Sequence, residues 1–392
     1  MKILYLANLR LPTEKAYGIQ IVKMCEAFTN SGHEVKLLYP YRKNLAINQD
    51  IFSYYSIKNK FDFKVVESKD FYLPGWLDKI AFLVKNYFSA TALINEALKE
   101  NADIYYTRDE RVAYVLSKKN KNVVFECHRF SNNKKRFYSH FKKIVAISNG
   151  LKEDLVKSGI ESQHILVARD GVDIEEFDVQ ISKEEARKKF FKNIHHESFA
   201  RKKLAVYIGN FYQWKGFNIF SDIAKYLCGV KVNYLVCFFG GTNKEISEFA
   251  NQLKKYQKHQ NLAPMVSLDI FDTEGRVPHH DVPYILKAAD CAILTGNESE
   301  AISAKYTSPL KMFEYMASGC PIVAHDLPSF REVLNNENSF LVEPGNAKTL
   351  AEKIAFVFEN EEDAKNKATK AFEDVQKYIW QNRVANILNF LR

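Results

Sequence analysis

The sequence predicts an α/β fold made of two doubly wound, parallel-sheet domains. Three observations carry this prediction: short apolar segments alternate with helical ones, the pattern restarts once after a charged stretch, and 392 residues suit two domains of ordinary size. Hydrophobic residues make up 46% and charged residues 26% of the chain, which excludes a wholly disordered or fibrous protein.

The first half of the chain alternates candidate strands with helices. MKILYLAN is the first strand, and residues 19–30 follow as a helix with an apolar face and Gly32 as its C-cap. The further candidate strands are EVKLLYP, DIYYTR, NVVFECH, KKIVAIS and HILVARDGV. Because this pattern is typical of a parallel sheet covered on both faces, we expect a Rossmann-like domain over residues 1–180.

A charged stretch separates the two domains. Residues 181–203 are poor in strand-forming residues, and we interpret them as a linker with one short helix. The strand pattern restarts over residues 204–371 with LAVYIGN, VNYLVCFFGG, VSLDI, CAILTG, CPIVAHD and SFLVEPG. Residues 372–392 are predicted to form one amphipathic helix that could pack on either domain, including back on the N-terminal one.

Charge and cysteine content narrow the function classes. The net charge of +9 is too mild to indicate nucleic acid, but it fits an anionic substrate or a membrane surface. The six cysteines show no metal-ligand spacing, so we interpret them as reduced core thiols of a cytoplasmic protein. The first apolar run is too short for a signal peptide, and no apolar stretch is long enough to cross a membrane.

Ligands of doubly wound sheets bind beyond the carboxyl ends of the strands, so residues directly after strands are the candidates. Gly18 begins the helix after the first strand, where it could expose helix N–H groups to an anion or simply form a tight turn. Lys215 lies in the turn after the first strand of the second domain, as a phosphate ligand or as an ordinary surface lysine.

A capped helix follows a later strand of the second domain. Ser308 is a natural N-cap and Pro309 a natural first residue, and we expect the helix to stop at Gly319. Its free N–H groups and positive dipole end suit a diphosphate, and Glu314 could accept hydrogen bonds from ribose hydroxyls. The alternative is an ordinary capped helix with one solvated glutamate.

Three segments of the second domain together resemble a known family. SPLKMFEYMASGCPIVA resembles the nucleotide-sugar signature of the family-four retaining glycosyltransferases (glycosyl transferases group 1, GT-B fold), YIGNFYQWKG their phosphate-binding loop, and GRVPHHDVPYILKAADCAIL their nucleobase segment. KAYGIQIVKMCEAFTNSGHEVKLLYP, FECH, IVAISNGLKEDL and VARDGVDIEEF carry a weaker likeness in the first half. The resemblance implies the GT-B fold, two Rossmann-like domains facing across a cleft.

The resemblance also implies roles for individual residues. Lys215 would bind the donor diphosphate, Glu314 the ribose and His128 the donor sugar, and these three are the catalytic candidates. Ser308 and the following amides would cap the phosphates, the backbone of Val277 would meet the base, and Gly18 would line the diphosphate and the acceptor cleft. The implied donor-binding positions are Gly18, Gly209, Asn210, Lys215, Val277, Tyr306, Ser308, Pro309, Leu310 and Glu314.

Two positions depart from the family pattern. Asn210 stands where the family usually has an arginine, so the phosphate clamp would rest on Lys215 and the helix amides. Tyr306 stands where the first of two glutamates eight residues apart is usual, which leaves the donor sugar open. Related members with an SPLK-type helix start often lack that glutamate, so a loss of activity does not follow.

Candidate acceptor-binding residues lie in the first domain. Glu126 and His128 alternate along one strand, so both side chains are expected on one face. Arg108, which follows DIYYT, and Arg129 are the further acceptor candidates. A lone histidine is often structural, but the position of His128 at the carboxyl edge of a strand favours a functional role.

The resulting interpretation is a metal-independent, retaining hexosyltransferase without a cofactor. Its donor would be a nucleotide-sugar, UDP-linked in preference to GDP-linked, and its acceptor a glycan or a lipid-linked glycan of bacterial surface polysaccharide, lipopolysaccharide or capsule synthesis. Two alternatives stay open: a nucleotide-sugar epimerase, and a non-catalytic partner that binds a nucleotide-sugar and stabilises another transferase.

Two segments suggest a membrane as a partner. Residues 129–143 contain six Lys or Arg and no acidic residue, with aromatic residues between them, and residues 71–77 lead into the apolar run IAFLVKNYF. This combination suits the anionic inner face of the cytoplasmic membrane, so we expect peripheral association there. The alternative is a solvated basic helix and a core helix. Nucleic acid is not expected as a partner.

Overall fold

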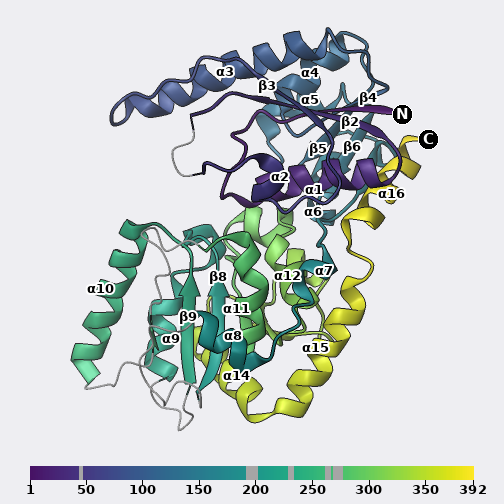
Figure 1. The fold of residues 1–392 in the computed structure, drawn as a ribbon. Helices are drawn as coiled ribbons and strands as arrows, with labels where there is room; N and C mark the ends of the chain where they lie inside the picture. Colours follow the sequence, from purple (N-terminus) through teal and green to yellow (C-terminus); the bar gives the residue numbers. More distant parts are fainter. Residues whose placement is uncertain (44–46, 191–201, 228–233, 261–265, 268–276) are drawn as a thin grey trace. The chain divides into compact units, whose positions relative to one another are not determined.

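The computed structural model describes residues 1–43, 47–190, 202–227, 234–260, 266–267 and 277–392. The chain divides into two compact units, unit 1 with residues 1–171 and 380–392 and unit 2 with residues 172–379. Each unit contains one parallel sheet with helices packed against it (Figure 1). The predicted pair of doubly wound, parallel-sheet α/β domains is therefore confirmed.

Unit 1 is built on a seven-stranded sheet of order β3-β2-β1-β4-β5-β6-β7. Its strands are β1 (Lys2–Leu6), β2 (Glu34–Pro40), β3 (Asp62–Val66), β4 (Ile104–Thr107), β5 (Val123–Cys127), β6 (Lys143–Ala146) and β7 (Ile165–Val167). Its helices are α1 (Ala16–Asn30), α2 (Ile51–Tyr54), α3 (Leu77–Ala97), α4 (Glu110–Lys118), α5 (Lys135–Tyr138), α6 (Asn149–Lys157) and α16 (Trp380–Leu391). Sequence analysis missed β3, which is mostly exposed and therefore lacks an apolar run.

Unit 2 is built on a six-stranded sheet of order β10-β9-β8-β11-β12-β13. Its strands are β8 (Lys203–Ile208), β9 (Tyr234–Phe239), β10 (Val266–Ser267), β11 (Cys291–Leu294), β12 (Ile322–His325) and β13 (Phe340–Val342). Its helices are α7 (Ile174–Phe177), α8 (Lys183–Phe190), α9 (Ile219–Leu227), α10 (Asn243–Gln260), α11 (Val282–Ala288), α12 (Leu310–Ala317), α13 (Pro328–Arg331), α14 (Ala347–Glu359) and α15 (Glu361–Val375). The order reverses between β8 and β11, which is where ligands bind in sheets of this kind.

The central strand of unit 2 is buried on both faces. Leu204, Val206 and Ile208 of β8 belong to a core that includes residues of α11 and α12. Ala205 and Tyr207, which alternate with them, belong to a second core formed with α9 and α14. Because successive side chains of a strand point to opposite faces, helices cover both sides of the sheet. Only the ends of the strands and their loops are left to bind a ligand.

The predicted domain boundary and linker were wrong. Unit 1 ends at Gly171 rather than at residue 180, and α8 packs on α11 inside unit 2 instead of bridging two domains. Of the expected linker over residues 181–203, residues 191–201 lie outside the described part of the chain. The error arose because charged residues on one exposed helix face have the same composition as a linker.

The C-terminal segment is two helices and not one. α15 ends at Val375, α16 begins at Trp380, and Ile379 pairs with Val172 as a parallel bridge within unit 2. α16 packs against α1 and belongs to unit 1, so residues 380–392 are part of the N-terminal unit. The periodicity of residues 372–392 continues through the break, so the sequence pattern did not reveal it.

Two expectations from composition can be checked on the described residues. Five of the six cysteines are buried free thiols, as predicted, and Cys228 lies outside the described residues. Over the same described ranges, no helix combines the length and the apolar character needed to cross a bilayer.

Glycines allow three loops at the carboxyl edge of the unit 2 sheet to touch. A Cβ added to Gly216, whose φ is +69°, would lie 2.4 Å from the carbonyl oxygen of Gly296. A Cβ on Gly240 would lie 2.2 Å from the carbonyl oxygen of Gly209. The loops after β8, β9 and β11 therefore pack backbone against backbone, which is possible only without side chains at these positions.

We expect Gly216→Ala to destabilise the protein more than Gly345→Ala. Both glycines have left-handed φ values, +69° and +75°, but nothing lies within 4 Å of a Cβ on Gly345. The control should lose about 1 kcal/mol from backbone strain alone, and the Gly216 variant about 2–4 kcal/mol, because its Cβ also meets backbone. Urea denaturation measures both, and equal losses would contradict the close packing of these loops.

Candidate active site

The turn after β8 positions Lys215 at the edge of the unit 2 sheet. Residues Gln213–Lys215 form one turn of 3-10 helix that ends at Gly216. The hydroxyl of Thr295, directly after β11, donates to the carbonyl oxygen of Lys215 at 2.7 Å. The Lys215 ammonium lies 5.2 Å from the Trp214 ring centroid. Lys215 is thus held by its backbone, and sequence analysis had not identified Thr295 as its support.

The helix after β11 begins one residue later than predicted. α12 starts at Leu310, and Pro309 occupies the cap position with extended backbone, so the assignment of Ser308 as N-cap and Pro309 as first helical residue was wrong by one position. Ser308 is buried beside this start. The helix ends at Ser318 and Gly319 with φ +65°, as predicted.

Glu314 is buried against a histidine that sequence analysis missed. Its side chain is only 9% exposed, and its Oε1 accepts a hydrogen bond from Nε2 of His279 at 3.0 Å. This burial contradicts the alternative of a solvated glutamate. His279 belongs to the short 3-10 segment His279–Asp281, which falls inside the nucleobase segment named above. It lies 35 residues before Glu314, so the sequence pattern could not indicate that the two side chains meet.

Lys311 is a second cation at the same edge, and it was also missed. Its ammonium lies 4.8 Å from the centroid of the Tyr207 ring at the end of β8. Burial, followed by the charge of Lys215, lowers the pKa of Lys311 well below its usual value, and Glu314 opposes this effect. Two like charges close together indicate a place where an anion is favoured.

The remaining donor candidates of unit 2 lie at or near this edge. Gly209 follows β8 directly, and Asn210 comes next and is half-buried. Tyr306 ends the turn Ile302–Tyr306 that precedes α12 and is half-buried. Val277 packs against the core of the unit, next to residues 268–276, which lie outside the described part. Thus Lys215, Lys311 and Glu314 form the group that the structure brings together.

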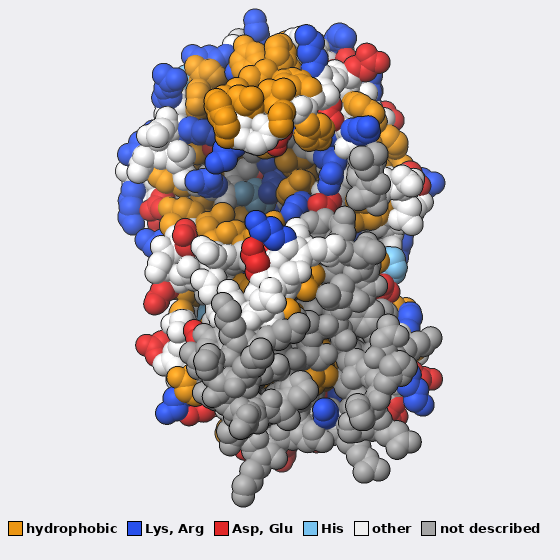
Figure 2. Space-filling model, turned by 90° about the vertical axis from the view of Figure 1, so that its left-hand side faces the viewer, with side chains coloured by type: hydrophobic (Ala, Val, Ile, Leu, Met, Phe, Trp, Pro, Cys, Tyr) orange, Lys and Arg blue, Asp and Glu red, His pale blue; other side chains and the backbone are white. Residues whose placement is uncertain are grey.

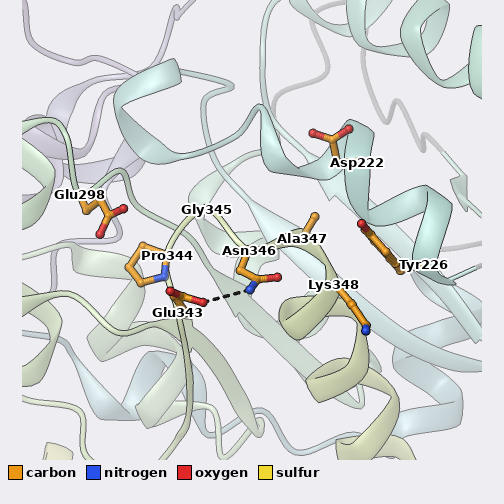
Figure 3. Close-up of a pocket in the computed structure, with 9 residues that line it drawn as sticks. All are labelled: Asp222, Tyr226, Glu298, Glu343, Pro344, Gly345, Asn346, Ala347 and Lys348. Atoms are coloured by element: carbon orange, nitrogen blue, oxygen red, sulfur yellow. Dashed lines mark hydrogen bonds between the residues drawn. The ribbon is translucent and has the colours of Figure 1, made fainter.

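A separate open pocket in unit 2 does not suit a phosphate (Figure 3). Its volume is about 490 Å³, and Asp222, Glu298 and Glu343 contribute carboxylates to its lining against a single lysine, Lys348. Three acidic side chains would repel a diphosphate.

Among the described residues, no group of three His, Cys, Asp or Glu side chains has the arrangement of a metal site. The expectation that no metal takes part stays a prediction.

In unit 1, four side chains converge on the carboxylate of Glu126. Oε1 accepts from Gln20 Nε2 at 2.7 Å and from His128 Nε2 at 2.5 Å, and Oε2 accepts from Arg383 Nη1 at 3.2 Å. The Tyr106 hydroxyl also donates to Oε2. Burial alone would raise the pKa of Glu126, but the charge of Arg383 and the His128 hydrogen bond hold it well below its usual value.

This arrangement corrects the role predicted for Glu126. Its side chain has no exposed surface, so it cannot contact an acceptor, and it instead orients His128. Because an ionised carboxylate can only accept, Nε2 of His128 carries the hydrogen and Nδ1 is left as an acceptor in the neutral ring. Burial and the charge of Arg108 lower the pKa of His128 to about 4. His128 is therefore neutral at physiological pH.

The other unit 1 candidates differ in what they contact. Arg108 Nη1 donates to Gln20 Oε1 at 2.8 Å, which joins it to the Glu126 group through Gln20. Arg129 is exposed and is not part of this group. A Cβ on Gly18 would lie 2.1 Å from the Tyr55 hydroxyl, so packing accounts for this glycine.

Comparison with known families decides what this pair of units is. The family model described as Glycosyl transferases group 1 matches residues 188–374, and the model described as Glycosyltransferase Family 4 matches residues 18–176. The chain belongs to the family-four, group 1 glycosyltransferases. No curated protein matches this glycosyltransferase at the level of sequence.

Solved structures confirm that this glycosyltransferase has the GT-B fold. A glycosyltransferase from Rickettsia africae is 18% identical with a TM-score of 0.72, covering 100% of this chain and 97% of that one. HepE of Anabaena, solved in complex with UDP and glucose, is 16% identical with a TM-score of 0.71, over 99% and 98% of the two chains. WaaB, a lipopolysaccharide outer core galactosyltransferase, is 16% identical with a TM-score of 0.65, over 100% and 99%.

Two groups of unit 1, the buried Asp170 and the half-buried His128, should make the stability depend on pH with opposite signs. Burial raises the pKa of Asp170 to about 6, from an ordinary value of 3.8, although Arg383 opposes the shift. The pKa of His128, about 4, lies below its ordinary value of 6.5. The contribution of His128 is therefore complete above pH 6.5 and is lost as the pH falls through 4. That of Asp170 is complete below pH 3.8 and is lost as the pH rises through 6.

We expect two variants to separate these contributions. Between pH 6 and pH 4, the unfolding free energy of His128→Gln should rise relative to the unmodified protein, and that of Asp170→Asn should fall. Each slope is at most about 1.4 kcal/mol per pH unit, the limit for one proton, and the slope for His128 is smaller because its ring is partly exposed. Urea denaturation at several pH values measures the differences. Slopes of the same sign would contradict these protonation states.

Proposed function

We propose that this glycosyltransferase transfers a hexose from a UDP-sugar to a glycan or lipid-linked acceptor, with retention of configuration and without a metal or other cofactor. We further propose a role in bacterial surface polysaccharide, lipopolysaccharide or capsule synthesis. Two comparisons support this choice: HepE was solved with UDP and glucose, and WaaB is named as a lipopolysaccharide galactosyltransferase. UDP is favoured over GDP for the same reason.

The position of Lys215 carries the proposal. Its ammonium lies at the carboxyl edge of the sheet where the strand order reverses, in the same unit as the start of α12 and the buried Glu314. When the bond from the sugar C1 to the phosphate oxygen breaks, negative charge grows on the departing diphosphate. A fixed cation and the positive end of a helix stabilise that charge without reorganisation.

The rest of the reaction needs no nucleophile from the protein. The acceptor oxygen forms the new bond to C1, and its proton passes to the departing phosphate oxygen, so charge and atoms balance. We propose that His128 contacts the donor sugar and that Glu314 holds the ribose, the roles that the family resemblance implies. A neutral His128 with Nδ1 as acceptor suits a sugar hydroxyl, which can donate to it.

We expect UDP to raise the melting temperature of the protein and Lys215→Met to remove most of this effect. A charge-assisted contact to phosphate is worth about 1.5–3 kcal/mol, so its loss should weaken UDP binding by about 10–100-fold. Thermal shifts with UDP, GDP and ADP, each with and without EDTA, measure the response. Lys348→Met is the matched control, because Lys348 is an exposed lysine of the separate open pocket.

The outcomes separate the candidate functions. A UDP-selective shift that EDTA does not change, together with an α-linked product from an α-linked donor by NMR, supports the retaining transferase. A shift without any turnover favours the non-catalytic partner, and conversion of the donor without an acceptor favours the epimerase. A shift lost in Lys348→Met but kept in Lys215→Met would place the nucleotide in the wrong pocket for this proposal.

We also propose that unit 1 associates with an anionic membrane surface through α3. The first half of this helix and the loop before it expose a patch of apolar side chains, with Trp76 73% and Leu83 68% exposed. The other large members of this α3 patch are Tyr72, Leu73, Ile80, Phe82, Val84, Tyr87 and Phe88. Figure 2 shows hydrophobic side chains gathered at the top of the view with Lys and Arg around them. Aromatic and aliphatic side chains ringed by cations suit the boundary of an anionic bilayer.

The basic segment over residues 129–143 contributes less than the sequence suggested. Tyr138 and Phe141 are buried and pack on Phe125, so these aromatic residues belong to the core of unit 1. Lys134 pairs with Glu110. At the α3 patch, by contrast, Arg111 stacks 3.7 Å from the Tyr87 ring centroid, and Lys79 is exposed on the helix. The patch therefore has both the apolar surface and the cations.

We expect the double variant Trp76→Ser, Leu83→Ser to lose binding to vesicles that contain phosphatidylglycerol. Each side chain should contribute about 1.5–3 kcal/mol of burial in the bilayer, so the partition coefficient should fall at least about tenfold. Phe356→Ser with Phe372→Ser is the matched control, because both side chains are exposed on unit 2. Flotation with phosphatidylcholine vesicles tests the need for anionic lipid. Equal flotation of both double variants would exclude the patch.

A further inference from the structure

The ammonium of Lys311 occupies the space that the Cβ of any residue other than glycine would fill at position 209. A Cβ built on Gly209 would lie 1.5 Å from Nζ and 2.6 Å from Cε of Lys311. The Lys311 side chain therefore runs from the first turn of α12 to the end of β8, and its charged end lies against the backbone of Gly209. The next residue is Asn210, the position where the family resemblance would lead one to expect an arginine.

The charged groups around this ammonium act on it in opposite directions. Its charged neighbours are Lys215, which disfavours the protonated form of Lys311, and Glu314, which favours it but is hydrogen-bonded to His279. Among the described residues, no carboxylate lies within ion-pair distance of Lys311 Nζ; its nearest aromatic partner is the Tyr207 ring. Holding two ammonium groups together at a partly buried edge is unfavourable until an anion joins them.

We propose that Lys311 is the second cation of the diphosphate site and supplies the charge that Asn210 lacks. The inference rests on the proposed function, since it assigns a further ligand to the same nucleoside diphosphate. It also gives a reason for the glycine at 209 beyond its φ of +145°: any side chain there would take the place of the ammonium. Residues 209, 210 and 311 thus act as a set, in which a cation from α12 replaces one from the loop after β8.

The proposal predicts that phosphate binding changes the protonation of Lys311. Without an anion, the pKa of Lys311 lies well below its usual value because of burial and Lys215. A diphosphate beside the ammonium favours its charged form and raises that pKa. Binding of UDP at alkaline pH should therefore take up a proton, whereas binding of uridine should not. A lysine that only packs against Tyr207 would give no such uptake.

The test compares UDP and uridine binding by calorimetry in the full-length protein. In Lys311→Met, UDP affinity should fall about tenfold or more, uridine affinity should stay within about twofold, and proton uptake on UDP binding, measured in buffers of different ionisation enthalpy, should disappear. The melting temperature without ligand should not fall, because the substitution removes a buried like charge. Lys348→Met is the control and should retain both affinity and proton uptake.

A second variant tests whether the charge can be moved back to the loop. Adding Asn210→Arg to Lys311→Met should recover most of the lost UDP affinity, because the guanidinium would enter the space that the lysine vacates. If Lys311→Met binds UDP like the unmodified protein while Lys215→Met does not, the inference is overturned and the proposed function stands. If the unmodified protein binds neither UDP nor another nucleotide, the proposed function itself fails. An equal loss of UDP and uridine affinity would show a structural role and overturn the inference.

Discussion

The buried pair of Glu126 and Arg383 is the interaction on which unit 1 depends. Both side chains are almost fully buried, and the guanidinium also donates to the carbonyl oxygens of Ala168 and Arg169. A buried charge without its partner is strongly destabilising. The contacts of Arg383 therefore hold β5, the end of β7 and α16 together in addition to apolar packing. The same carboxylate fixes the tautomer of His128, which links the stability of the unit to its chemistry.

The candidate site of unit 2 differs from that of unit 1 in how its charges are arranged. The unit 2 site is made by close approach of loops that carry glycines, and by two lysines, Lys215 and Lys311, whose like charges oppose each other. In unit 1 the buried charge of Glu126 is balanced by Arg383, whereas unit 2 brings two like charges together. A negative leaving group supplies what the second arrangement lacks. This contrast agrees with a donor site in unit 2 and a charge-balanced support for His128 in unit 1.

Much of the fold could be predicted from the sequence, because buried parallel strands are continuous apolar runs. The strand β3 could not be predicted, because it is mostly exposed and has no apolar run. The break between α15 and α16 could not be predicted either, because the helical spacing of apolar residues continues through it. Lys215 and Glu314 could be identified from their motifs. Lys311 and His279 could not, because their importance depends on contacts with β8 and α12 that arise only when the chain folds. Glu126 was identified, but the sequence did not reveal that it is fully buried.

The return of α16 to unit 1 has a consequence for the order of synthesis. Unit 2 is continuous in the chain, and all of its residues are synthesised before Arg383. Unit 1 is interrupted in the chain by unit 2, so Glu126 has no Arg383 guanidinium to pair with until all of unit 2 has been synthesised. The nascent residues 1–171 therefore lack part of their buried contacts while residues 172–379 are being synthesised. Synthesis of residues 380–392, rather than of residues 1–171, is the step that completes the unit carrying His128.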